Sequence, residues 1–195
     1  MRQYAVGMTG NNAGTLWTIG HSTRAWDEFA AMLLAARIEV LADVRRFAGS
    51  RRNPQFSGQA MGADLAASDI AYLPMPELGG RRPTRADSPN LAWRNARFRG
   101  YADYMQTPDY RAARERLAQL AREKRVAVMC AEAMWWQCHR SLIADDFKAA
   151  GWEVIHLLSP GREQEHPYTS AAHIVEGRLD YTARIEDAQQ APLFP

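Results

Sequence analysis

Five short apolar runs are spaced along the chain, and stretches with helical periodicity separate them. The runs are LWTIG at 16–20, EVLADV at 39–44, IAYLPM at 70–75, RVAVMC at 125–130 and WEVIHLL at 152–158. They are almost continuously apolar, as strands of a parallel sheet are when both of its faces are buried. The alternation of these strands with helices predicts an α/β fold: a three-layer sandwich with a five-stranded, mainly parallel sheet and helices on both faces.

The helical stretches carry apolar stripes and recognisable ends. WDEFAAMLLAAR follows the first run, and YADYMQTPDYRAARERLAQLAREK precedes the fourth, where Pro108 is expected to break or restart the helix. CHRSLIADDFKAAG follows the fourth run, and Gly151 is placed to end its helix. A short helix is also expected in the segment after Ser159.

The length of 195 residues suits one domain, which we place at 15–185, between a flexible leader at 1–14 and an irregular tail at 186–195. No apolar run approaches the roughly 18 residues of a membrane span, and the first residues lack the apolar segment of a signal peptide. We therefore expect a cytoplasmic protein with no membrane partner. In that compartment two cysteines are usually thiols.

Polar residues follow several of the predicted strands directly. His21 and Ser22 end the first, Asp43, Arg45 and Arg46 the second, Gly79 follows the third, and Cys130 and Glu132 end the fourth. Since parallel strands present their carboxyl ends at one edge, where ligands bind in open α/β sheets, these groups are expected to share a hollow. Each also has a structural interpretation: His21 at a helix start, Asp43 as a cap or ion-pair partner, Glu132 as a loop acid.

The segment CAEAMWWQCHR at 130–140 contains both cysteines and allows several interpretations. A disulfide conflicts with a reducing compartment, and no Cys-x5-Arg loop is present. Zinc is disfavoured because Cys138 and His139, adjacent at a helix start, are expected to point roughly 100° apart, so no metal and no cofactor are predicted. Cys138 can instead be a nucleophile activated by the helix N-terminus, or Glu132, His139 and Arg140 can surround a bound anion.

Arginine dominates the basic residues and gathers in two long loops at 45–62 and 77–100. Trp93, Phe98 and Tyr101 interleave with the arginines of the second loop. Guanidinium groups and stacking rings are the usual means of holding nucleotides and single strands. A solvated loop whose aromatic residues anchor it to the core is an equally simple explanation.

The motifs TIGHS, LADVRRFAGSRRNPQF, LPMPELGGRR, RGYADYM and CAEAMWWQCHRSLIA together resemble the domain of unknown function 488 family, over about residues 18–174. The resemblance implies a small, soluble protein without an established activity. The positions that it carries over are Gly20, His21, Ser22, Asp43, Val44, Arg45, Pro54, Phe56, Leu78, Gly79, Tyr101, Met105, Cys130, Glu132, Cys138, His139 and Arg140. The chain departs from the family pattern at Trp135 and Trp136, where a more polar loop is expected.

These observations favour an enzyme, a hydrolase or group transferase, that acts on a nucleotide, a nucleic acid or another phosphate-bearing molecule at the carboxyl edge of the sheet. The catalytic candidates are His21, Asp43, Glu132, Cys138 and His139. The substrate-binding candidates are Ser22, Arg45, Arg46, Phe56, Gly79, Tyr101, Trp135 and Arg140. A nucleic-acid or nucleotide binding module without catalysis and a cysteine-dependent redox or metal protein are the alternatives, and a homo-oligomer stays open.

Overall fold

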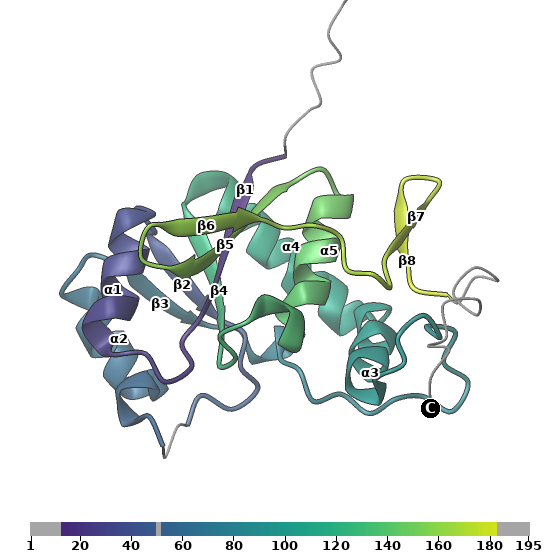
Figure 1. The fold of residues 1–195 in the computed structure, drawn as a ribbon, viewed down its shortest axis with the longest axis horizontal. Helices are drawn as coiled ribbons and strands as arrows, with labels where there is room; N and C mark the ends of the chain where they lie inside the picture. Colours follow the sequence, from purple (N-terminus) through teal and green to yellow (C-terminus); the bar gives the residue numbers. More distant parts are fainter. Residues whose placement is uncertain (1–12, 50–51, 183–195) are drawn as a thin grey trace, which may run out of the picture.

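The computed structural model describes residues 13–49 and 52–182 of the chain (Figure 1). The predicted tail at 186–195 lies outside the described residues, and so does the predicted leader apart from its last two positions. The bounds of the single domain therefore stay a prediction. No helix within the described ranges is long and apolar enough to cross a membrane.

A six-stranded sheet forms the centre of the molecule, in the order β3-β2-β4-β1-β5-β6. The strands are β1 (Thr15–Gly20), β2 (Val40–Asp43), β3 (Ala71–Pro74), β4 (Val126–Cys130), β5 (Glu153–Ser159) and β6 (Arg162–Glu165). All neighbouring pairs are parallel except β5 and β6. The α/β fold with a mainly parallel sheet is confirmed. Each of the five apolar runs coincides with one of the strands β1 to β5, and the ends of run and strand differ by at most one residue.

Helices cover both faces of this sheet (Figure 1). The α-helices are α1 (Trp26–Ala35), α2 (Gly58–Ala66), α3 (Ala96–Met105), α4 (Pro108–Glu123) and α5 (Arg140–Ala149), and the short 3-10 turns are η1 (Pro54–Phe56), η2 (Pro76–Leu78) and η3 (Trp135–Gln137). Pro108 opens α4 as expected, because proline needs no hydrogen-bond acceptor in the first turn and Thr107 caps the helix by accepting from the Tyr110 N–H.

Alternation along the strands divides the core into two clusters on opposite faces. In β4, Val126, Val128 and Cys130 pack with α3, α4 and α5, whereas Ala127 and Met129 pack with α1 and α2. Successive side chains of a strand point to opposite faces, so both faces need apolar residues and the run appears continuous in sequence. The same alternation aims Cys130 at the face that α5 covers.

The sheet has six strands, not the five that the apolar runs predict, and the additional one is β6. Strand β6 has the sequence REQE, which contains no apolar residue to signal a strand. It pairs antiparallel with β5 after a tight turn in which Gly161 has a positive φ of 69°. A short, charged edge strand of this kind also discourages pairing with a further chain.

The expected short helix after Ser159 is wrong as well. Strands β7 (His173–Val175) and β8 (Arg178–Asp180) form a separate antiparallel hairpin there. The two residues between them, Glu176 and Gly177, have φ values of 50° and 75°. Positive φ at both central residues is the mark of the type I′ turn, which matches the twist of paired strands.

Candidate functional site

A cavity of about 580 Å³ opens at the carboxyl ends of β2 and β4. The chain leaves β2 toward the face covered by α2 and leaves β4 toward the face covered by α5, which is the divergence that creates ligand crevices in open α/β sheets. Four segments line the cavity: Arg45, Arg46, Phe47 and Gly49 after β2; Gly80 and Arg81 after η2; Asn95, Arg97 and Phe98 at the start of α3; and Cys130, Ala131, Glu132, Trp136, Gln137, Cys138 and His139 around η3.

Asp43 and Arg45 form a buried ion pair at the inner wall of this cavity. The Arg45 Nη2 and Nε donate to the two Asp43 carboxylate oxygens at 2.6 and 2.8 Å, and the Tyr72 hydroxyl donates to the same carboxylate at 2.7 Å. Burial and the neighbouring carboxylate raise the pKa of the Tyr72 hydroxyl, which therefore stays a donor. Asp43 does not line the cavity, and its oxygens are occupied by these donors.

His21 lies behind Arg45, not in the cavity. Its ring stacks on Phe56 at 4.4 Å, its Nδ1 lies 2.9 Å from the Ser22 carbonyl oxygen, and its Nε2 lies 3.2 Å from Arg45 Nη1. An Nδ1–H that donates to the carbonyl leaves Nε2 to accept from the guanidinium, so the ring is neutral. Burial, opposed by the Ser22 hydrogen bond and aided by the Arg45 charge, lowers the pKa of His21. His21 thus helps to hold Arg45.

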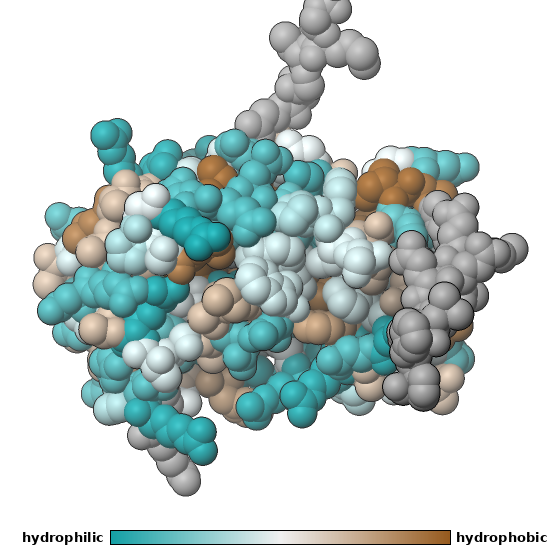
Figure 2. All heavy atoms as spheres, viewed as in Figure 1, coloured by the Kyte–Doolittle hydropathy of each residue, from teal (hydrophilic) through white to brown (hydrophobic). Residues whose placement is uncertain are grey.

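Three further arginines of the cavity, Arg46, Arg81 and Arg97, form no ion pair with any described carboxylate. All three are exposed. Arg46 donates from Nη1 to the Arg81 carbonyl at 2.9 Å, which ties the two loops together. Arg45 is neutralised by Asp43, and Glu132 is the one acid among the described residues of the lining, so these residues together carry an excess of positive charge. The edge of the molecule that carries these loops is largely hydrophilic (Figure 2).

Two glycines allow the loops to approach closely. A Cβ added at Gly79 would lie 2.8 Å from the Arg46 backbone, and one added at Gly80 would lie 2.8 Å from His139 Nδ1. Tyr101 packs against the same histidine: its ring centroid lies 4.9 Å from that of His139, while its hydroxyl donates to the Leu78 carbonyl. Gly79 and Tyr101 therefore shape the wall of the cavity without lining it.

Cys130, Cys138 and His139 converge at the inner end of the cavity. The His139 Nδ1 lies 3.8 Å from Cys130 Sγ and 3.5 Å from Cys138 Sγ, and all three atoms lie within 4.8 Å of one another. Both cysteines are free thiols. The expectation that Cys138 and His139 diverge by 100° is wrong, because Cys138 has an extended backbone and only His139 has helical angles.

The two thiols differ in their ionisation. A hydrogen bond from Cys138 lowers the pKa of Cys130 against the effect of burial, and the nearby His139 and Arg140 act in the same direction. Burial raises the pKa of Cys138, and the hydrogen bond to Cys130 adds to this effect. Cys130 is consequently the more acidic sulfur of the pair. Cys130 was expected at this edge as the end of the fourth strand but was not among the catalytic or binding candidates, and its position as the last residue of β4, aimed at the α5 face, was the available signal.

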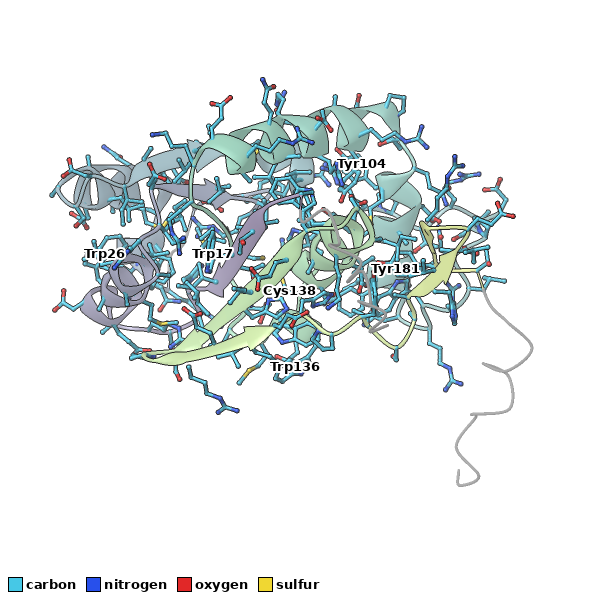
Figure 3. The ribbon with its side chains drawn as sticks, turned by 90° about the horizontal axis from the view of Figure 1, so that it is seen from above. Trp17, Trp26, Tyr104, Trp136, Cys138 and Tyr181 are labelled. Carbon is cyan, nitrogen blue, oxygen red and sulfur yellow. The ribbon has the colours of Figure 1, made fainter. Side chains whose placement is uncertain are left out.

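Arg140 and Trp135 do not line the cavity. The Arg140 Nη2 donates to the Glu132 and Ala133 carbonyls, both at 2.7 Å, and so holds the loop between β4 and η3. Trp135 stacks on His156 at 4.7 Å inside the protein. Its neighbour Trp136 lines the cavity and is 48% exposed, and Figure 3 shows it near the rim of the molecule with Cys138 farther inside.

The structure brings five of the predicted site residues into the cavity lining. These are Arg45, Arg46, Glu132, Cys138 and His139. The other eight lie behind it or beside it: His21, Ser22, Asp43, Phe56, Gly79, Tyr101, Trp135 and Arg140. Their roles as catalytic or binding groups stay predictions. The lining residues outside the predicted set include Arg81, Arg97 and Phe98, which belong to the second arginine loop.

A second cavity, of about 400 Å³, lies between α3, α4 and β8. It contains Asp146, whose carboxylate accepts from the Tyr110 hydroxyl at 2.9 Å and from Arg114 Nε at 3.3 Å. Burial raises the pKa of Asp146. Because the Asp146 carboxylate is already held by Tyr110 and Arg114, this acid is less open to a ligand than the exposed arginines of the first cavity are.

Comparison with known families gives one match. Residues 25–147 match the sequence model described as "Domain of unknown function DUF488". Searches of curated proteins and of solved structures found no match to the chain. The matched segment extends from the start of α1 into α5 and contains every residue that lines the arginine-rich cavity.

Proposed function

The chain belongs to the DUF488 family, a domain of unknown function, and we propose that it is an enzyme that hydrolyses or transfers a phosphate-bearing group of a nucleotide bound in the cavity at the carboxyl edge of its sheet. One observation carries the proposal: Arg46, Arg81 and Arg97 face one cavity without a carboxylate partner among the described residues. Guanidinium groups that no protein carboxylate neutralises are suited to the oxygens of a phosphate.

The dimensions and the rings of the cavity favour a nucleotide over inorganic phosphate. Its volume of about 580 Å³ lies within the usual range for small-molecule sites. Phe47 and Trp136 line it and are exposed, and Phe98 lies beside them at the start of α3. An exposed aromatic face next to a guanidinium offers a base a stacking surface while the arginines hold the phosphates.

Glu132 supplies the proton chemistry in this proposal. Among the lining residues that the structure describes it is the acid, and the loop that carries it is held by Arg140. In hydrolysis, a water oxygen forms a bond to phosphorus, the bond from phosphorus to the leaving-group oxygen breaks, and the water proton passes to Glu132 and then to that oxygen. His21 and Asp43 act as positioning residues, because they hold Arg45 against the cavity wall.

The binding half of the proposal is tested by calorimetric titration with nucleoside mono- and diphosphates, inorganic phosphate and pyrophosphate. Arg46→Gln, Arg81→Gln and Arg97→Gln are each expected to weaken nucleotide binding by about tenfold, because each removes a charge-assisted hydrogen bond of roughly 1.5 kcal/mol. Arg37→Gln is the matched control, since Arg37 is exposed before β2, at the opposite edge of the sheet. Unchanged affinity in the variant that lacks all three arginines would remove the proposal.

The catalytic half is tested by product formation from the nucleotides that bind. Glu132→Gln is expected to abolish turnover while binding is kept, because the amide has nearly the shape of the acid but cannot accept the proton. Binding that weakens steeply with salt and yields no product from any nucleotide would instead make the protein a binding module. Both cysteines are free, which suits a reducing compartment, and we keep the cytoplasm as the proposed location.

A further inference from the structure

The two sulfur–nitrogen distances among Cys130, Cys138 and His139 match edges of a tetrahedron around a metal ion, and the three ligand atoms all lie within 4.8 Å of one another. With zinc–sulfur and zinc–nitrogen bonds of about 2.3 and 2.05 Å, a tetrahedral site places sulfur and nitrogen about 3.6 Å apart. The two sulfur–nitrogen distances here are 3.5 and 3.8 Å. We propose that these three residues bind one Zn²⁺ and leave its fourth coordination position open to the arginine-lined cavity.

The fold holds the three ligands without the metal. Cys130 is fixed as the last residue of β4, which pairs with β1 at Gly20, and His139 is fixed at the start of α5. Cys138 has an extended backbone, with φ −130° and ψ 147°, and this conformation turns its sulfur to the same side as the His139 ring. Gly80 keeps the space beside Nδ1 clear, because any larger residue would place its Cβ 2.8 Å from that atom.

Two sulfurs and one imidazole nitrogen select a borderline-soft metal. Thiolate and imidazole ligands suit zinc, whereas calcium and magnesium require oxygen ligands. Two thiolates balance the charge of a divalent ion, so the site would be neutral beside the arginines. All three ligands line the cavity. With three protein ligands the site resembles catalytic zinc centres, which keep one position for water or substrate, more than closed structural ones.

A catalytic role for this metal rests on the proposed function, whereas binding of the metal does not. Zinc would lower the pKa of its water and so supply the hydroxide that attacks phosphorus. The oxygen of that hydroxide forms the new bond to phosphorus, the bond to the leaving-group oxygen breaks, and Glu132 carries the water proton to that oxygen. Glu132 lines the same cavity but does not belong to the group of converging ligand atoms.

The full chain offers a direct test, since it has two cysteines and both belong to the proposed site. Protein stripped with a chelator and kept reduced is titrated with Zn²⁺, and its metal content and reactive thiols are counted. We expect one Zn²⁺ per chain and protection of both thiols from alkylation when it is bound. Co²⁺ in its place should give the intense visible bands of a tetrahedral site and a thiolate-to-cobalt charge-transfer band.

Substitutions distinguish the loss of a metal ligand from the loss of the folded structure. Cys138→Ser and His139→Gln should each lose stoichiometric binding, and Glu132→Gln should keep it; circular dichroism checks that each variant is folded. Since Cys138 is buried and its replacement can unfold the chain, the cobalt spectrum of the unaltered protein is the second measurement. A folded, reduced protein that takes up neither Zn²⁺ nor Co²⁺ would overturn the site. A disulfide between the two cysteines that persists after treatment with a reductant, and so excludes the metal, would overturn it as well.

The two proposals fail in different ways. If Zn²⁺ binds as expected and no nucleotide does, the metal site stands and the proposed function falls. If the metal-free protein binds and hydrolyses nucleotides as well as the Zn²⁺-loaded protein does, the proposed function stands without the metal in its mechanism. Uptake of Zn²⁺ that survives His139→Gln in a folded protein would assign the ion to other residues and overturn the site.

Discussion

A buried chain of hydrogen bonds links β1, β5 and α5, and it should make stability depend on pH. His166 Nε2 lies 3.0 Å from an Asp145 oxygen, His166 Nδ1 lies 2.8 Å from His156 Nε2, and His156 Nδ1 lies 2.6 Å from the Thr18 hydroxyl. Since the carboxylate only accepts, His166 donates to it and accepts from His156, which in turn accepts from Thr18. His156, which donates from Nε2 and accepts at Nδ1, is neutral in this arrangement.

The size of this pH effect on stability follows from the pKa of His156. Burial, together with the electrostatic effects of His166 and Arg140, lowers the pKa of His156 from 6.5 to about 2. Below pH 6.5 the unfolded chain takes up a proton at this position and the folded chain does not, so the free energy of unfolding falls as the pH falls. Between about pH 7 and about pH 5 the contribution of His156 to this fall is about 2 kcal/mol.

Urea denaturation followed by circular dichroism at several pH values measures this effect. His21 is also buried with a lowered pKa and adds to the pH dependence of the unaltered protein, so the comparison is made by difference. His156→Gln should show a shallower dependence, by about 2 kcal/mol between about pH 7 and about pH 5. Thr18→Val is the control: it leaves His156 Nδ1 without its donor, which costs about 1–3 kcal/mol at every pH but keeps the slope. Parallel curves for His156→Gln and the unaltered protein would refute the argument.

Two further predictions concern the edge of the sheet. A Cβ at Gly20 would lie 1.9 Å from the Glu132 carbonyl oxygen, so Gly20→Ala should lower the free energy of unfolding by about 3 kcal/mol or more. Gly49→Ala is the control, because a Cβ there meets open space, and it should change the free energy of unfolding by no more than about 0.5 kcal/mol. Thermal melts measure both variants. Tyr72→Phe removes the hydroxyl that donates to Asp43 at 2.7 Å; a loss of about 1.5–3 kcal/mol is expected in urea, and unchanged stability would mean that this hydrogen bond contributes nothing net.

The parallel strands could be predicted because burial on both faces leaves a continuous apolar signal. Strand β6 gave no such signal, since its residues REQE are mostly exposed and it is held by main-chain hydrogen bonds to β5. The hairpin of β7 and β8 was hidden for a related reason: its information lies in the turn at Glu176 and Gly177, not in an apolar pattern. Edge strands of this kind depend on turn geometry, which short polar segments reveal poorly.

The sequence was sufficient to place the candidate site at an edge of the sheet. It did not show which residues line the cavity and which only hold the lining residues in position. Strand ends indicate which residues approach the edge, and His21 and Asp43 do approach it. An ion pair was one interpretation of Asp43, but its partner Arg45 and the contact of Arg45 with His21 were not predictable, because they depend on how far each side chain reaches between neighbouring strands. The convergence of Cys138 with His139 was missed for a different reason: the angular argument needs helical backbone angles at both residues, and Cys138 is extended while His139 is the N-cap of α5.

The partners of each charged group explain which of them can serve a ligand. The Arg45 guanidinium already forms hydrogen bonds with Asp43, His21 and the Phe56 carbonyl. A bound anion would have to compete with these buried hydrogen bonds, and breaking them costs free energy. The exposed arginines of the cavity make no such bonds to carboxylates. An anion therefore gains most from the outer arginines, while the inner pair fixes the wall against which the ligand would lie. On this argument, replacing Asp43 should disturb folding first and binding second, whereas replacing Arg81 should affect binding alone.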